Sequence, residues 1–268
     1  GYNANMLANE MFLDSADLRS SVVSKAKQVG YTPSSSVSSK ATIDVVVNNA
    51  SGTSLTMTAG TKFTTTVNTE SYSFVNKEDV TITPIDGVYK FSDLDIFEGS
   101  YLNYKYTANT SDLEQRFIIP NDSVDTSTLR VKVQNSSSDS TTNTYTLATG
   151  LTGLTPTSQV YFLQEVENGR YEVYFGDGVL GKAIADGNIV IFDYVTCNRG
   201  LPNGASTFTL SENIGGFSNV TITTKSNAAN GSGPESIASI KYNAPRDYAS
   251  QDRAVTAEDY KVLVKSLY

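Results

Sequence analysis

From Ala41 onward, apolar residues recur at every second position in short runs separated by turn-forming residues. Ile43, Val45 and Val47 form the first run, and similar runs follow at 55–59 and 63–67. A period of two places alternate side chains on opposite faces of a strand. The pattern predicts an antiparallel meander and commits most of the chain to strands.

Four more strands are predicted at 72–75, 80–83, 88–91 and 101–107. A second group of strands begins near Gln115 and contains the pair Asn168-Gly169 between two apolar runs. Because Asn-Gly tolerates the positive φ angles of a tight turn, we predict a hairpin there. The run 188–195 is almost continuously apolar, which is typical of a strand buried on both faces. The polar tract 135–143 is predicted to be an exposed loop.

The two long strands 101–107 and 188–195 flank the block 117–185, so we expect this block to be a subdomain inserted into the first β domain. Both flanking strands should then lie in one body. The predicted division is as follows: 1–40, an N-terminal helical segment and linker; 41–116, the first β domain; 117–185, the inserted β subdomain; 186–268, a return to the first β domain plus a C-terminal helix.

Residues 6–29 carry apolar side chains at the spacing of one helix face. Asp14 or Ser15 is expected to cap a second helix that runs to Val29 and stops at Gly30. The apolar stripe fits packing on its own domain or on a partner helix, and both alternatives stay open. The linker 34–40 is rich in serine.

Near the C-terminus, Arg246 and Arg253 bracket a polar stretch that is expected to be irregular. Thr256 to Asp259 reads as a capping box that opens an amphipathic helix. We expect a buried polar network in the segment 243–268. The predicted fold class is therefore mainly β (α+β), with antiparallel β domains, an amphipathic N-terminal helix and a capped C-terminal helix.

Composition argues against several classes of function. The net charge of −8 and the pI near 4.6 oppose binding to nucleic acid. No apolar run is long enough to cross a membrane as a helix. The chain has no His, which excludes a Ser-His-Asp triad, and Cys197 is the single cysteine, expected to be a small buried residue. The chain starts at Gly1, and we expect it to be a piece of a longer polypeptide.

Gly176, Gly178 and Gly181 match the dinucleotide fingerprint G-x-G-x-x-G. That fingerprint requires a following helix, whereas a turn and a strand follow here. We therefore predict that these glycines, with Asp177 between them, form a structural turn. Calcium at Asp177 is not favoured either, since the EF-hand ligand pattern is missing.

Two other patterns suggest catalysis only weakly. The carboxylates of Asp93, Asp95 and Glu98 are close in sequence, but acids also fill exposed turns. Ser24 and Lys27 satisfy S-x-x-K without its companion motifs. We predict no enzyme activity, no catalytic residues, no metal and no cofactor.

Four segments, in order and spanning nearly the whole chain, resemble the baseplate J-like wedge proteins of contractile-tailed phages, and among them the T-even wedge subunits of the inner baseplate ring. The segments are LRSSVVSKAKQVGYTP (18–33), SLTMTAGTKF (54–63), YEVYFGDGVLGKAIADGNIVIFDY (171–194) with RGLPNGA after it, and IKYNAPRDYASQDRAVTAEDYKVLV (240–264). Many members carry a Trp in the second β unit, where this chain has none; Tyr145 is the expected replacement.

The resemblance implies a structural virion protein of the tail baseplate, assembled in the host cytoplasm. It implies association as a homo-dimer or ring, contacts with other baseplate wedge proteins, and rearrangement when the sheath contracts. The structural motif residues would be Gly176, Asp177, Gly178, Gly181, Arg246, Arg253, Thr256 and Asp259. The alternative is a carbohydrate-binding or depolymerising tail module, for which a cleft lined by exposed Tyr would be expected.

Overall fold

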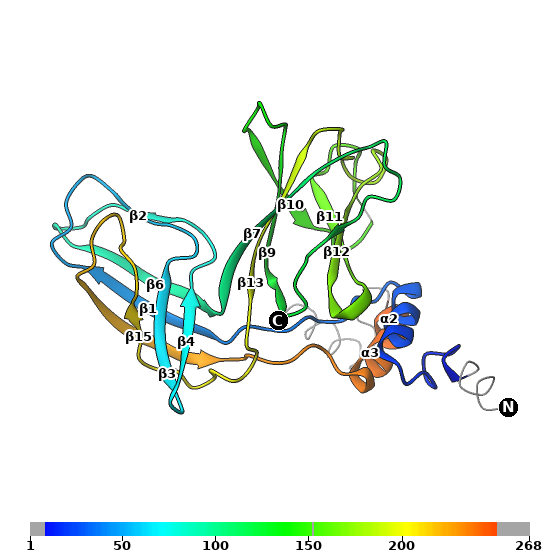
Figure 1. Ribbon diagram of the computed structural model, residues 1–268, viewed down its shortest axis with the longest axis horizontal. Coiled ribbons are helices and arrows are strands. Elements are labelled where there is room, and N and C mark those ends of the chain that lie inside the picture. The colour runs from blue at the N-terminus through cyan, green and yellow to red at the C-terminus, as the bar shows by residue number, and fades with distance from the viewer. Residues whose placement is uncertain (1–8, 152, 251–268) are drawn as a thin grey trace.

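The computed structural model describes residues 9–151 and 153–250 (Figure 1). Strands dominate, and one helix lies toward each end of the described chain: α2 (Arg19–Gln28) and α3 (Ile237–Ser250). The mainly β fold class with terminal helices is thus confirmed. No helix in the described ranges has the length and apolar character that a membrane span requires.

The first body is a six-stranded sheet with the order β14-β3-β4-β6-β1-β15. Its strands are β1 (Lys40–Val47), β3 (Lys62–Val67), β4 (Glu70–Val75), β6 (Tyr89–Glu98), β14 (Thr209–Leu210) and β15 (Val220–Ala229). A separate two-stranded sheet joins β2 (Leu55–Met57) to β5 (Val80–Ile82). Alternate side chains of β1, among them Ile43 and Val45, are buried in the core of this body, as the period of two requires.

The expected meander over 41–67 is wrong in its pairing. β1 pairs with β6 and β15, and β2 pairs with β5. Only β3 and β4 of this region form a local hairpin. The strands themselves lie where the alternation places them, but a local pattern carries no information about a distant partner such as β15.

The second body is a seven-stranded sheet with the order β7-β13-β9-β10-β11-β12-β8. Its strands are β7 (Ser100–Thr107), β8 (Phe117–Ile118), β9 (Val124–Gln134), β10 (Thr142–Leu147), β11 (Val160–Glu165), β12 (Tyr171–Phe175) and β13 (Ile189–Thr196). The hydroxyl of Tyr106 on edge strand β7 donates to the Ile118 carbonyl on edge strand β8, 2.6 Å away. The sheet therefore curls until one side chain spans its two edges.

Two sequence-based details of this sheet are confirmed, the turn at 168–169 and the buried strand at 188–195, while the replacement of a Trp by Tyr145 stays a prediction. The turn between β11 and β12 is a short 3-10 segment (η1, Glu167–Gly169) with φ of 61° at Asn168 and 70° at Gly169. β13 is buried along nearly its whole length. Tyr145 is buried and packs edge-on against Phe175, with ring centroids 5.4 Å apart.

β7 and β13 pair over their full length, from Ser100 opposite Thr196 to Thr107 opposite Ile189. They lie in one body, as expected. That body is the second sheet, so the sheet assignments change at Ser100 and Thr196 rather than at 117 and 185. The division into folding domains stays a prediction.

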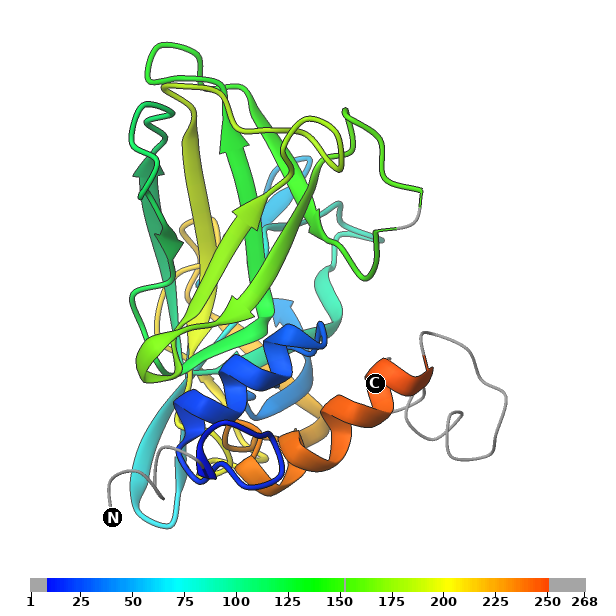
Figure 2. The same cartoon turned by 90° about the vertical axis from the view of Figure 1, so that its right-hand side faces the viewer.

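The two helices lie against each other beside the lower end of the second sheet (Figure 2). Val22 and Ala26 of α2 pack on Ile240 and Ala244 of α3 in a small separate core. The apolar stripe of α2 is therefore covered by the same chain. A partner helix is not needed to bury it.

Three local predictions about the helices need correction or lie outside the described residues. Leu18, rather than Asp14 or Ser15, is the N-cap of α2, and the Glu10 carboxylate accepts hydrogen bonds from the N–H groups of Asp17 and Leu18. The stretch around Arg246 is helical, because α3 runs through it despite Pro245. The predicted cap at Thr256 lies outside the described residues.

Candidate functional site: the junction of the two sheets

Four of the predicted motif residues form one turn. Gly178 has φ of 86° and Gly181 φ of 91°, and the Gly178 N–H donates to the Gly181 carbonyl at 3.0 Å. A Cβ on Gly176 would lie 2.3 Å from the Gly181 carbonyl carbon. Asp177 Oδ1 accepts from the N–H groups of Leu180 and Val179, both at 2.9 Å, and these bonds lower the pKa of its carboxyl. A structural role for this turn remains our proposal.

The C-terminal motif residues are only partly described. Arg246 is exposed on α3, where its guanidinium stacks 3.5 Å from the Tyr242 ring centroid and donates to the Tyr242 carbonyl. Arg253, Thr256 and Asp259 lie outside the described residues. The polar network expected around 243–268 includes Asn243, whose amide donates to Glu235 Oε1 at 2.8 Å.

Four chain crossings connect the bodies, and they meet at one place. The chain passes from α2 to the first sheet through 30–39, from β6 to β7 at Gly99, from β13 back to the first sheet through 197–208, and from β15 to α3 through 230–236. The first and last crossings bridge each other by reciprocal backbone hydrogen bonds between Val37 and Ser232, both 3.0 Å.

The serine-rich linker is the buried centre of this junction. Ser35, Ser36, Ser38 and Ser39 are each at most 4% exposed. Ser39 Oγ lies 2.6 Å from Asn203 Oδ1 and donates to it. The amide of Asn203 in turn donates to the Gly231 carbonyl and accepts from the Gly231 N–H, each at 3.0 Å. Small side chains therefore let three crossings pack together, with Ser39 and Asn203 hydrogen-bonded across them, while the buried hydroxyls of Ser36 and Ser38 have no hydrogen-bond partner among the described residues.

The β6 to β7 crossing is held by Glu98 and Gly99. Glu98 is fully buried, and its carboxylate accepts from the Asn198 backbone N–H at 2.8 Å and from the Asn198 side-chain amide at 2.7 Å. Burial raises the pKa of Glu98, and the bonds from Asn198 oppose that rise. A Cβ on Gly99 would lie 1.8 Å from the Thr196 carbonyl oxygen, so only glycine permits this approach.

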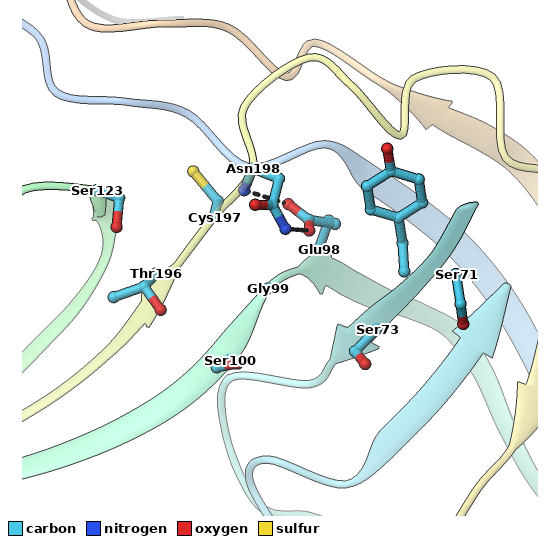
Figure 3. Close-up of a pocket in the computed structure, with 10 residues that line it drawn as sticks. Ser71, Ser73, Glu98, Gly99, Ser100, Ser123, Thr196, Cys197 and Asn198 are labelled. Atoms are coloured by element: carbon cyan, nitrogen blue, oxygen red, sulfur yellow. Dashed lines mark hydrogen bonds between the residues drawn. The ribbon is translucent and has the colours of Figure 1, made fainter. Parts of the chain in front are cut away.

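A cavity of about 280 Å³ lies at this junction (Figure 3). Its lining is mostly hydroxyl and amide groups: Ser71, Tyr72, Ser73, Glu98, Gly99, Ser100, Ser123, Thr196, Cys197 and Asn198. The lone thiol belongs to Cys197, which is 7% exposed, and burial raises its pKa. A thiol in this state is a poor nucleophile, consistent with the expected buried role.

A second polar cluster attaches the helices to the second sheet. The Arg19 guanidinium on α2 donates to both carboxylate oxygens of Glu165 on β11, at 2.7 and 2.8 Å, and to the Glu235 carbonyl. The Glu235 carboxylate accepts from the Tyr31 hydroxyl at 2.8 Å. The hydroxyl of Tyr171 on β12 donates to the Pro33 carbonyl at 2.8 Å. Helices, linker and sheet are thereby held in one arrangement.

The acidic cluster of the sequence does not converge on one point. Asp95 bonds the Lys40 ammonium and the Thr42 hydroxyl on β1, whereas Asp93 is exposed with φ of 51°. Glu98 is directed to the junction instead. The sequence does not predict the contacts of Asn198, Asn203 and Glu235, because each residue bonds a chain segment distant in sequence and no local motif marks it.

The described polar side chains of the junction thus fix chain crossings and pack the sheets and helices together, which defines a protein built of β lobes. Comparison with known proteins shows which proteins this chain is similar to. Residues 104–203 match the third domain of the bacteriophage baseplate wedge protein gp6. This range covers the second sheet from within β7 to just beyond β13.

The chain is also 25% identical over 290 aligned residues to the baseplate wedge protein gp6 of Enterobacteria phage T4. The alignment covers 98% of this chain and 43% of that protein. Together the two matches confirm the resemblance, and the chain is related to the baseplate wedge proteins of contractile-tailed phages. The similarity to a baseplate wedge protein extends along nearly the whole chain.

Proposed function

We propose that the chain is a structural subunit of a baseplate wedge that associates with copies of itself, as a dimer or ring, and binds neighbouring wedge proteins. It would build the inner baseplate and support its rearrangement when the sheath contracts. The observation that carries the proposal is the similarity to a wedge protein along 98% of the chain. The chain spans 43% of that relative's length. Its association with copies of itself and with neighbouring wedge proteins is therefore part of what we propose.

The surface around the helix pair supports an assembly role. Met11 and Phe12, which precede α2, are 64% and 67% exposed, and Tyr242 and Tyr248 on α3 are 53% and 58% exposed. Large apolar side chains gathered around one structural unit are typical of surfaces that other proteins cover. By contrast, the apolar faces of both sheets are already buried in their own cores.

We further propose that the protein works without catalysis, in the virion tail baseplate, after assembly in the host cytoplasm. The alternative function, a carbohydrate-binding or depolymerising tail module, would use exposed Tyr in a cleft. Among the residues that line the junction cavity, Tyr72 is the single Tyr. Several large Tyr side chains, such as Tyr171 and Tyr194, are buried in cores instead.

Light scattering over a range of concentrations tests self-association. The chain should form dimers or larger species at high micromolar concentration, and the double substitution Met11→Ser with Phe12→Ser should weaken them. Leu113→Ser is the matched control, since Leu113 is 96% exposed elsewhere in the molecule. A strictly monomeric mass at every concentration would contradict self-association. Co-purification with wedge proteins of the same phage tests the other partners.

A further inference from the structure

The junction differs electrostatically from the rest of the molecule. The buried acidic side chains in the described ranges are Asp44, Glu98, Asp125, Glu165, Glu172 and Asp193. All except Glu98 and Asp125 form an ion pair with Lys or Arg at 2.7 to 2.9 Å. An ionised carboxylate without a cation is costly to bury, and hydrogen bonds offset that cost only in part.

Both of these carboxylates lie at the junction. Glu98 ends β6 and is bonded to Asn198 on the crossing that leaves β13. Asp125, at the start of β9, accepts from the N–H of Ser38 in the serine linker at 2.8 Å. Adjacent linker residues connect the two acids, because the Ser39 carbonyl accepts from the Glu98 N–H and the Ser38 N–H donates to Asp125, each at 2.8 Å.

The groups that face Glu98 from neighbouring elements do not neutralise it. In the serine linker the Ser39 carbonyl accepts from the Glu98 N–H, and on β1 the Lys40 ammonium is bonded to Asp95. On β4, the Ser73 carbonyl accepts from Gly99. The crossing after β13 contributes Cys197, Asn198 and Arg199, and within the described residues Arg199 forms no ion pair with either carboxylate.

We propose that this junction is a hinge between the two sheets, held shut by the Glu98–Asn198 pair and biased toward opening by its two uncompensated carboxylates. Opening returns these two carboxylates to water, whereas the other four buried acids are already paired with Lys or Arg. Asn198 is exposed and lies at the wall of the 280 Å³ cavity, so water reaches the bond first from that side. The contact between Gly99 and Thr196 places the pivot where the second sheet begins and ends.

The closed state should depend on protonation of Glu98. Because burial raises the pKa of Glu98, the closed form binds the proton more tightly than an open, hydrated form does. Closure is therefore favoured in acid, and that advantage is lost as the pH rises above the ordinary value of 4.5 and through the raised one. At neutral pH the charge of Glu98 favours the open form to its full extent.

Glu98→Gln tests the proposal in the whole chain. Glutamine removes the charge and keeps two hydrogen bonds, provided that the Asn198 amide turns over. Spin labels at Thr223→Cys on β15 and Lys105→Cys on β7, both exposed, report the distance between the sheets, because the native Cys197 is buried. At neutral pH the variant should narrow the distance distribution and slow hydrogen exchange of the Gly99 and Asn198 amides by about fivefold or more. An unchanged or broader distribution, or faster exchange, overturns the hinge.

Asn198→Asp supplies the opposite test, which also serves if Glu98→Gln does not fold. A second carboxylate beside Glu98 should broaden the distribution of distances between the spin labels at neutral pH. In acid, where both carboxyls are protonated, the narrow distribution should return. A distribution that stays narrow at neutral pH overturns the proposal. Glu172→Gln is the matched control, since Glu172 is buried but paired with Arg116 inside the second sheet. It should lower the melting temperature and leave the distance between the sheets unchanged.

Discussion

Arg19 on α2 and Glu165 on β11 are joined by two hydrogen bonds of 2.7 and 2.8 Å, although 146 residues separate them in the chain. The Glu165 side chain is 2% exposed, so its charge depends on the guanidinium. Arg19→Ala should therefore lower the free energy of unfolding by about 3 kcal/mol, measured by chemical denaturation. Gln28→Ala on the exposed face of the same helix should change it little, and equal effects of the two variants would contradict the argument.

Glycine conformation at the predicted turn gives a second prediction. Gly178→Ala should cost about 1 kcal/mol, because φ is 86° there while the nearest atom to an added Cβ is 3.8 Å away. Gly176→Ala should cost more, since its Cβ would meet the Gly181 backbone. Gly150→Ala is the control, in open space without a positive φ. Thermal denaturation ranks the three variants.

The same turn should have no affinity for nucleotides. Millimolar ATP or NAD should leave the melting temperature unchanged, because bound ligand would raise it by mass action. A rise of several degrees would show that the glycines form a phosphate site after all.

Asp193 should make stability depend on pH in the sense opposite to Glu98. Burial opposes its charge, but the Lys132 ammonium at 2.9 Å and the Asn103 amide at 2.6 Å outweigh that effect and lower the pKa of its carboxyl. The stabilisation is complete above the ordinary value of 3.8 and is lost as the pH falls through the lowered one. Asp193→Asn should cost roughly 2 kcal/mol at pH 7, and the difference from the parent protein should shrink in acid. A constant difference from pH 7 down to pH 2 would refute this assignment.

Arg253, outside the described residues, remains a prediction from the sequence. Arg253→Ala should lower stability and assembly together, by a few kcal/mol if its partners are buried. Arg246→Ala is the natural comparison, because Arg246 is exposed and bonds only within its own helix turn in the described contacts, so a change below about 0.5 kcal/mol is expected. An unchanged melting temperature and normal assembly for Arg253→Ala would show that its segment is surface decoration.

Local chemistry explains which features the sequence predicts well. Alternation locates strands such as β1 and β13, and Asn168-Gly169 locates a hairpin, because each signal lies within a few residues. The partner of each element cannot be predicted in this way. β15 pairs with β1 from more than a hundred residues away, and α3 covers α2 from still farther, so neither local pattern predicts which segment packs against it.

The junction cannot be predicted from the sequence for the same reason. The spacing of Glu98 groups it with Asp93 and Asp95, whereas its side chain bonds Asn198. The composition of 34–40 predicts a loop or linker, and burial of its serines follows only from the other crossings packed around it. A polar segment can be a core when other backbones supply its hydrogen-bond partners.

The pairing of Ser100 with Thr196 places the first and last residues of the second sheet side by side. The chain thus leaves and rejoins the first body at nearly the same point. Lobes of other sizes or surfaces could be exchanged between these two positions without moving the strands on either side. The second sheet is therefore a single excursion of the chain, and a change in the length of its outer loops need not displace the strands of the first sheet.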